Sequence, residues 1–182
     1  RQIDKLGIDR AKIYPSIRSL ELKRVARGVY CPANMKPDYM YLVCARNHEV
    51  ILSHESSAFL HGLLQEEPDY VSVTTAHGYN AKHLTEKWVT SYQAKREWFE
   101  IGKERIIDQF GNNVCAYNPE RTVCDFIREM DYLKQRGNQM PEAAIANYFT
   151  YYQKRNIERL AEYACTFRIS AQVSQYLSKY EQ

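Results

Sequence analysis

Residues 6–30 read LGIDRAKIYPSIRSLELKRVARGVY, and this stretch decides how the start of the chain folds. Its apolar residues recur at helical spacing and can form one buried face, namely Ile13, Ile17 and Leu20. Gly7 precedes them, as in the turn between two short helices. The basic run 23–27, which Gly28 ends, is typical of a two-stranded wing. The stretch therefore predicts the second half of a winged helix-turn-helix, in which a helix enters the DNA major groove.

Positive charge is concentrated in the same stretch. Residues 1–30 hold eight Lys and Arg residues and three acidic residues, a net charge of +5, whereas residues 31–182 have a net charge of −2. Contacts with phosphates supply sequence-independent affinity for DNA, and a clustered basic surface is their footprint. Taken alone, the charge is also compatible with a solvated basic surface that has no DNA partner.

The side chains that lie off the apolar face are the predicted DNA contacts. We expect Ser16, Arg18 and Ser19 to read base edges, whereas the other basic residues hold phosphates. The full set of predicted DNA-binding residues is Arg10, Lys12, Tyr14, Ser16, Arg18, Ser19, Lys23, Arg24 and Arg27.

Pro15 conflicts with a simple recognition helix, because proline removes a backbone donor and clashes with the preceding turn. The helix can begin late, with Pro15 in its first turn and Asp9 capping a separate short turn. Otherwise one helix runs from Arg10 and kinks. The late start is favoured, since the residue before a proline disfavours helical geometry. Only residues 1–5 precede the turn, so we expect the DNA-binding domain to be partly truncated.

Length and composition indicate a folded protein with one or two domains. The chain has 182 residues, of which 45% are hydrophobic and 13% aromatic. No apolar run approaches the ~20 residues that span a bilayer, and no signal peptide is visible, so we expect a cytoplasmic protein without a membrane partner. The five cysteines are odd in number and lack CxxC spacing, which predicts buried thiols rather than disulfides or a zinc site.

The chain divides into a DNA-binding domain at 1–36 and a second domain at 37–182, because two prolines flank a short polar stretch after the wing. Strands are expected mainly over 50–117, with candidates at 71–75, 88–92, 98–101, 106–110 and 114–117. Residues 39–46 form a helix or a buried strand, and 53–63 form a capped helix that a glycine ends.

Helices are expected over 119–180, with Pro119 in a first turn and a break at Gly137. The predicted fold class is therefore α+β: an N-terminal winged helix-turn-helix followed by a mixed α/β domain that ends in a helical bundle. Six tyrosines lie in these last helices. They indicate either a protein interface or, as we favour, ordinary core positions.

No residue pattern indicates catalysis, so we expect no enzyme, no cofactor and no metal. His54 and His61 lie too far apart to chelate one metal as an i, i+4 pair. Cys124 has no evident base, and Arg121 and Asp125 have the spacing of a structural ion pair on a helix. Nucleotide-binding and metalloprotease motifs are missing from the sequence, and Gly78 with its neighbours reads as a turn rather than an anion-binding loop.

Several motifs together, in this order, resemble one family. They are RGVY at 27–30, LSHESSAFLHGL at 52–63, VTT at 73–75, GYN at 78–80, YNPERTVCD at 117–125 and LAEYA at 160–164. The chain resembles the AbiEi family, the antitoxin and transcriptional repressor of the bacterial AbiE abortive-infection system, which protects against phages. The RGVY and ERTVCD segments carry most of the resemblance.

The resemblance implies a DNA-binding winged helix that recognises inverted repeats upstream of its own operon and represses it. It also implies a C-terminal domain that opposes a nucleotidyltransferase toxin, AbiEii, without a stable complex, as in type IV toxin–antitoxin systems. Pro15 and the short start depart from the family pattern. A winged-helix regulator whose C-terminal domain senses a ligand or binds the toxin is the alternative.

Overall fold

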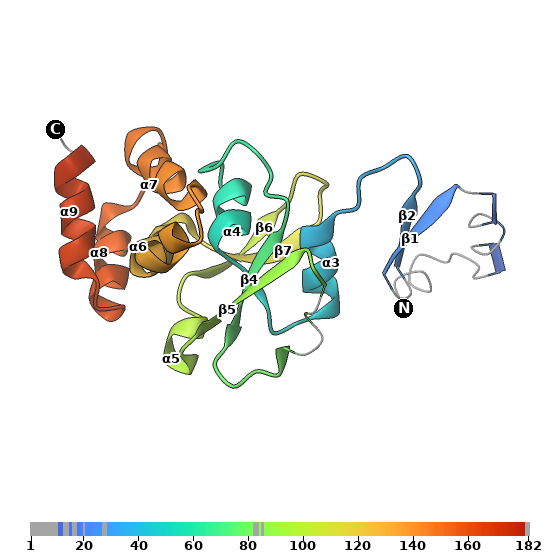
Figure 1. Cartoon of the computed structure of the whole chain (residues 1–182), viewed down its shortest axis with the longest axis horizontal. Coiled ribbons are helices and arrows are strands. Elements are labelled where there is room, and N and C mark those ends of the chain that lie inside the picture. Colours follow the sequence, from blue (N-terminus) through green and yellow to red (C-terminus); the bar gives the residue numbers. More distant parts are fainter. Residues whose placement is uncertain are drawn as a thin grey trace. The chain divides into compact units, whose positions relative to one another are not determined.

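A computed structural model describes residues 11–12, 15, 18–19, 21–26, 29–81, 84 and 86–180 (Figure 1). Contacts divide the chain into two compact units, Arg1–Asp38 and Tyr39–Gln182. This division lies two residues after the boundary that the sequence predicts between 36 and 37.

The first unit contains an antiparallel hairpin at the position where the sequence predicts two strands. Strand β1 (Leu22–Ala26) pairs with β2 (Val29–Pro32), and the register shifts between Arg24 and Ala26. The backbone N–H of Ala33 donates to the carbonyl of Glu21 at 2.9 Å, which extends the pairing beyond the ends of the strands.

Helical backbone occurs on both sides of Pro15 in the first unit. Ala11 and Lys12 are helical, as are Pro15 and Arg18, and the N–H of Ser19 donates to the carbonyl of Pro15 at 2.8 Å. The residues that would distinguish a late helix start from one kinked helix, 13–14 and 16–17, lie outside the described residues.

A mixed five-stranded sheet organises the second unit. Its strands are β3 (Ile51–Leu52), β4 (Val71–Ala76), β5 (Val89–Ala94), β6 (Lys103–Ile107) and β7 (Asn113–Tyr117), in the order β5-β4-β3-β7-β6. The pairs β4–β5 and β3–β7 are parallel, whereas β3–β4 and β6–β7 are antiparallel. The short β3 is the central strand, and both of its residues are apolar and fully buried.

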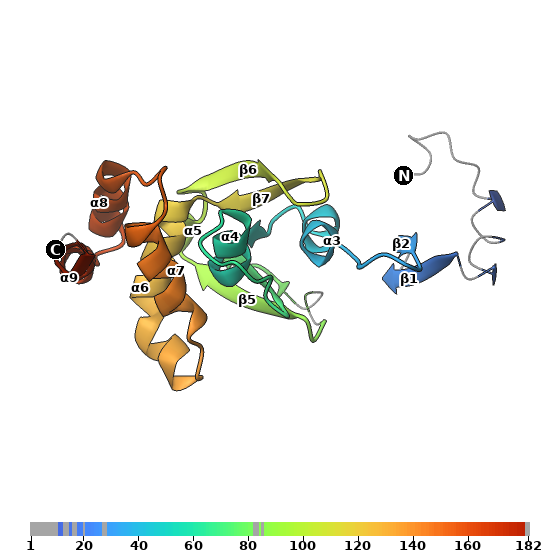
Figure 2. The same ribbon diagram turned by 90° about the horizontal axis from the view of Figure 1, so that it is seen from above.

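Seven helices accompany this sheet in the described part of the chain. They are α3 (Tyr39–Arg46), α4 (His54–Leu60), α5 (Arg96–Phe99), α6 (Pro119–Gln135), α7 (Met140–Thr150), α8 (Ile157–Thr166) and α9 (Ser170–Tyr180). Helices α6 to α9 gather at one end of the sheet and α3 lies at the other (Figures 1 and 2). The fold is therefore mixed α+β, with its helices mainly after the strands.

Two hydrophobic clusters form the core of the second unit. One joins α4 to the four C-terminal helices and includes Phe126, Ile145 and Leu160. The other lies between α3 and the sheet and includes Leu52 and Val73. Tyr148 is a core residue of the first cluster, whereas Tyr151 is exposed. The tyrosines of the last helices thus serve largely as core and boundary residues.

The expected strand at 98–101 is wrong, because Trp98 belongs to the short helix α5 and Ile101 follows it in a turn. A short apolar run does not distinguish strand from helix by its periodicity. Here the guanidinium of Arg121 binds the carbonyls of Trp98 and Ile101, which favours the turned backbone over a paired strand.

The start of α4 also differs from the prediction. Ser53 occupies the N-cap position, but its side chain makes no capping hydrogen bond. Its hydroxyl instead accepts from Thr74 on β4 at 2.9 Å, so a contact with the sheet replaces the cap. The helix ends before Gly62, which has a φ of +74°, as the sequence predicts.

The cysteines are free thiols, as predicted. The prediction that they are buried is wrong for most of them. Cys124 alone among them is fully buried, Cys165 is exposed, and Cys31, Cys44 and Cys115 are half-buried. Within the described residues, no helix combines the length and the apolar character that a bilayer span requires.

Candidate functional site

Five of the nine predicted DNA-binding residues lie within the described structure, and all five are exposed. They are Lys12, Arg18, Ser19, Lys23 and Arg24. The other four, Arg10, Tyr14, Ser16 and Arg27, lie outside the described residues. Lys12 and Arg18 have helical backbone, Ser19 lies in a turn, and Lys23 and Arg24 lie on β1.

The hairpin presents its basic side chains on two faces. Lys23 and Arg24 are consecutive on β1, and consecutive side chains of a strand point to opposite faces. The ammonium of Lys23 donates to the carbonyl of Ala33 at 3.2 Å, which holds it near the end of β2. Lys23, which the Ala33 carbonyl holds in place, thus lies on one face of the hairpin, and the guanidinium of Arg24 lies on the other.

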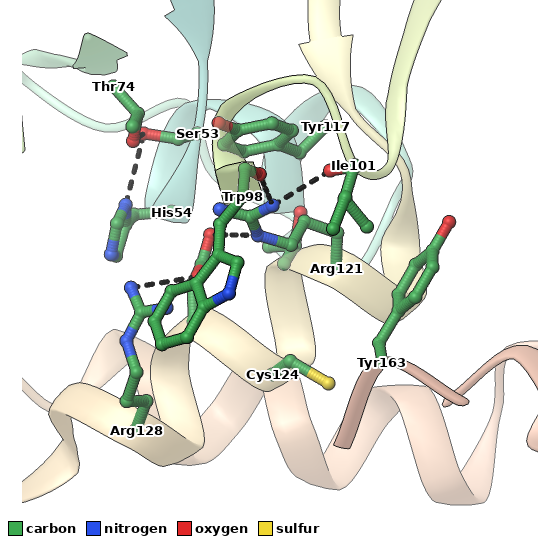
Figure 3. A network of polar contacts seen from close by, with 12 residues as sticks. Ser53, His54, Thr74, Trp98, Ile101, Tyr117, Arg121, Cys124, Arg128 and Tyr163 are labelled. Atoms are coloured by element: carbon green, nitrogen blue, oxygen red, sulfur yellow. Dashed lines mark hydrogen bonds and ion pairs between the residues drawn. The ribbon is translucent and has the colours of Figure 1, made fainter. Parts of the chain in front are cut away.

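The second unit contains a buried polar network around the start of α4 (Figure 3). His54 is 1% exposed and has a φ of 48°, a left-handed backbone that costs a non-glycine residue about 1–2 kcal/mol. Its ring stacks on Tyr92 with centroids 3.6 Å apart, and its Nδ1 lies 3.0 Å from Ser53 Oγ. These contacts compensate for the strained backbone.

Glu129 on α6 faces the other nitrogen of the same imidazole. Its Oε2 lies 3.4 Å from His54 Nε2. Burial acts to raise the pKa of Glu129, but the neighbouring His54 and Arg128 together hold it below its ordinary value. The carboxylate is therefore the charged partner that keeps the imidazole in place.

Glu55, the next residue of α4, is a fully buried carboxylate with two partners far away in the sequence. Ser72 on β4 donates its hydroxyl to Oε2, and Asn138 donates its Nδ2 to Oε1 at 2.7 Å. The hydroxyl of Ser56 accepts from the backbone N–H of Ser72. This part of α4 is thus joined to the sheet and to the loop after α6.

Arg121 on α6 is at the centre of a second buried network (Figure 3). It is 0% exposed, its Nε donates to Asp125 Oδ2 at 2.9 Å, and Nη1 donates to the two carbonyls at the end of α5. Its guanidinium carbon lies 4.1 Å from the ring centroid of Tyr117 and 4.5 Å from that of Phe167. The i, i+4 ion pair predicted for Arg121 and Asp125 is confirmed.

Glu120, beside it, links three C-terminal helices. Its Oε1 accepts from the Tyr148 hydroxyl at 3.1 Å and from the Asn156 backbone at 3.0 Å, while Arg159 lies 3.4 Å from Oε2. These charged groups thus bind partners within the core, as is usual for polar groups that stabilise a fold, although the buried Nη2 of Arg121 makes no hydrogen bond.

The buried cysteine and the histidine pair do not form a reactive site. Burial raises the pKa of the Cys124 thiol to about 12, so it stays protonated and unreactive. His61 donates from Nε2 to the carbonyl of Tyr117 at 2.9 Å, and burial lowers its pKa below the ordinary value. The described residues hold no group of three or more His, Cys, Asp or Glu side chains placed for a metal ion.

A pocket of about 510 Å³ opens beside these networks, between strand β5 and the C-terminal end of α6. Three tyrosines line it, Tyr70, Tyr92 and Tyr132, together with the basic residues Lys87 and Arg136. Sequence reasoning missed this pocket, because its residues lie up to 70 positions apart and no motif joins them.

A second pocket, of about 670 Å³, lies over the turn at Gly78, whose φ of +86° is the left-handed value that the turn requires. Arg96 donates from Nε to the carbonyl of His77 at 3.4 Å, and Lys103 is paired with Glu100. The nearby cations are thus already bound within the protein, as expected for a plain turn.

Comparisons with known proteins include a distant structural similarity. No protein-family model and no curated protein sequence matches the chain. Among solved structures, it is similar to the crystal structure of the RV2827C protein from Mycobacterium tuberculosis, with 13% identity and a TM-score of 0.46. The similarity covers 97% of this chain and 72% of that one. A function for this chain therefore has to be argued from its own residues.

Proposed function

We propose that this chain is a DNA-binding repressor that acts in the bacterial cytoplasm, and that its first unit is a winged helix. The observation that carries the proposal is the antiparallel hairpin β1–β2, which follows helical backbone and carries exposed basic side chains. These are Lys12 and Arg18 on the helical side and Lys23 and Arg24 on β1. The concentration of net charge in residues 1–30 supports the same conclusion.

The DNA target in this proposal is an inverted repeat upstream of the chain's own gene. The resemblance of residues 27–30 and 120–125 to the AbiEi family supports this choice. In the helix, Arg18 and its neighbours read bases in the major groove, while the hairpin holds phosphates beside it.

The second unit, in the same proposal, opposes a nucleotidyltransferase toxin without a stable complex. Two of the motifs that carry the resemblance, 52–63 and 117–125, pack against each other there, since Ser57 Oγ on α4 and Thr122 Oγ1 on α6 lie 2.7 Å apart. They therefore act mainly by maintaining the fold, so the antitoxic surface has to lie elsewhere on the unit.

Fluorescence anisotropy of the whole chain on labelled upstream DNA, with scrambled DNA as the control, tests the repressor half. We expect tight, salt-dependent binding with a strong preference for the upstream sequence. Equal and weak binding to both DNAs would exclude autorepression.

Growth of bacteria that express the neighbouring toxin gene tests the antitoxin half. Coexpression of this chain is expected to restore growth, while the two proteins separate during purification. Failure to restore growth would refute antitoxin function. Rescue together with co-purification would instead establish toxin capture by the second unit.

A further inference from the structure

The pocket at the edge of the sheet has the size of a small-molecule site. Its volume of about 510 Å³ lies within the roughly 300–1,000 Å³ that such sites occupy. It lies between β5, an edge strand of the sheet, and the loop that connects α6 to α7. Backbone and side chains from three separate parts of the chain thus converge on one space.

Asn138 and Tyr70, which are half-buried, form the less exposed end of this pocket, its floor. Asn138 lines it and donates from Nδ2 to the buried carboxylate of Glu55 at 2.7 Å, while its Oδ1 accepts from the backbone N–H of Met140 at 3.1 Å. Tyr70 lies 3.4 Å from the same Nδ2. Glu55 already accepts from Ser72 and Asn138, but the Oδ1 of Asn138 has a second lone pair, which favours a ligand group that donates a hydrogen bond.

Aromatic rings form the walls. Tyr92 is held in place because its ring stacks on His54, which Glu129 faces from α6. Burial and the nearby Glu55 raise the pKa of Tyr70 to about 12, and burial also raises the pKa of Tyr92. Both phenols therefore stay neutral, so their rings are available to a planar polar ligand.

The rim is basic. Lys87 and Arg136 are exposed there, and Arg136 donates from Nη1 to the Tyr132 hydroxyl at 2.8 Å, which places its guanidinium at the mouth. None of the described residues that line the pocket is acidic. The pocket thus offers a hydrogen-bond acceptor at its floor and positive charges at its mouth, which suits a ligand with a donor at one end and an anion at the other.

We propose that this pocket binds a nucleoside 5′-phosphate. The base lies among Tyr70, Tyr92 and Tyr132 and directs an amino group to the floor at Asn138, while Lys87 and Arg136 bind the phosphate. Aromatic rings stack on bases, and cations at an open mouth bind phosphate by charge-assisted hydrogen bonds. Guanine, adenine and cytosine carry an exocyclic amino group with two donor hydrogens, whereas uracil donates only through its ring N3–H.

Isothermal titration of the whole chain with GMP, AMP, UMP and ribose 5-phosphate tests the proposal. We expect GMP or AMP to bind at least roughly tenfold more tightly than UMP and ribose 5-phosphate, because those two lack the amino group or the base. Equal affinity for all four probes, or no binding of any at about 1 mM, would overturn the proposal.

Two exposed substitutions test where the phosphate binds. Lys87→Gln and Arg136→Gln are each expected to weaken binding of the preferred nucleotide by roughly tenfold, because each removes one charge-assisted contact. Lys154→Gln removes an exposed lysine of the loop after α7 and serves as the matched control. Affinities of all three variants equal to that of the unmodified chain would place the nucleotide outside this pocket.

A short RNA that ends in a 5′-phosphorylated guanosine or adenosine distinguishes the source of the ligand. Tighter binding of GMP or AMP than of the RNA identifies the free nucleotide, and the reverse identifies the end of a nucleic-acid strand. The site lies within the second unit alone. If no nucleotide binds there, the proposed DNA binding by the first unit is unaffected. If the first unit does not bind DNA, the proposal for this pocket is unaffected.

Discussion

The guanidinium of Arg121 lies between the rings of Tyr117 and Phe167 and uses its donors on one carboxylate and two backbone carbonyls. A charge removed from water in this way is stabilised by the partners that it binds, and removal of one partner leaves the other uncompensated. Arg121 therefore joins α6 to α5. Its side chain also lies so close to the backbone of Gly102 that a side chain at that position would collide with it.

Replacement of Arg121 by methionine tests this role. Arg121→Met is expected to lower the free energy of unfolding by about 3 kcal/mol or more, because Asp125 and two carbonyls lose their donor. Urea unfolding followed by circular dichroism measures the change. Arg155→Met, at an exposed arginine with a single backbone contact, is the control and should cost less than about 1 kcal/mol. Similar losses in both variants would contradict the role of Arg121.

Gly102 provides a second test. Its φ is +78°, and a Cβ atom there would lie 2.6 Å from the Cβ of Arg121. At Gly111, with a φ of +84°, a Cβ would meet nothing within 4 Å. Both alanine variants share the backbone strain of about 1–2 kcal/mol, so Gly102→Ala should destabilise by roughly 1–3 kcal/mol more than Gly111→Ala. Thermal or urea unfolding that ranks the two variants equally would refute the close approach.

The stability of the second unit should depend on pH through His61. Burial lowers its pKa in the folded state, with Tyr117 and Glu104 partly opposing this effect. Below pH 6.5 the unfolded chain therefore binds more protons, and the stability contributed by the neutral ring, present above that pH, is lost as the pH falls toward the folded-state pKa.

Urea unfolding at pH 7.5 and at lower pH measures this dependence. His61→Gln should show a smaller loss of stability over this range than the unmodified chain. His48→Gln, at an exposed histidine, should keep the full dependence. An unchanged slope in His61→Gln would show that another group is responsible.

At the scale of elements, the hairpin β1–β2 and the helical segment before it have separate tasks in the proposed DNA complex. The helical side chains read bases, whereas the hairpin contacts the backbone of the duplex. The alternation of Lys23 and Arg24 along β1 means that the two contacts lie on different faces, so their substitution should have different consequences from that of Arg18.

Anisotropy titrations separate these tasks. Arg18→Ala should cost roughly 1–3 kcal/mol on the preferred DNA and reduce the preference over scrambled DNA. Lys23→Ala should weaken binding to both DNAs similarly and reduce the slope of log affinity against log salt by about one. Lys154→Ala, in the second unit, is the control. Normal binding by both first-unit variants would refute the winged-helix proposal.

At the scale of the whole molecule, the two units differ in how deeply their described residues are buried. The second unit has two hydrophobic clusters, whereas none of the described residues before Met40 is fully buried. A folded unit with little buried surface is marginally stable, and a ligand that binds only its folded state stabilises it in proportion to its affinity.

Limited digestion with thermolysin tests this difference. Met35 is 49% exposed in the turn between β2 and α3, so cleavage is expected before it and should leave a resistant fragment that begins there. Preferred DNA should slow this cleavage by stabilising the first unit. First cuts within the sheet or the C-terminal helices would show that the second unit is the weaker one.

The sequence by itself determined those features that depend on neighbours along the chain. The C-terminal helices follow from apolar periodicity, and α6 has Pro119 in its first turn and Gly137 after its last turn. The Arg121–Asp125 ion pair follows from i, i+4 spacing. The tertiary structure alone decided that 98–101 turns instead of pairing as a strand and that Ser53 binds the sheet instead of capping α4. It also created the pocket, because Glu55 and Asn138 are 83 residues apart. The physical reason is that local spacing specifies which faces are apolar, whereas buried polar groups take whichever partners the packed chain brings within hydrogen-bond distance.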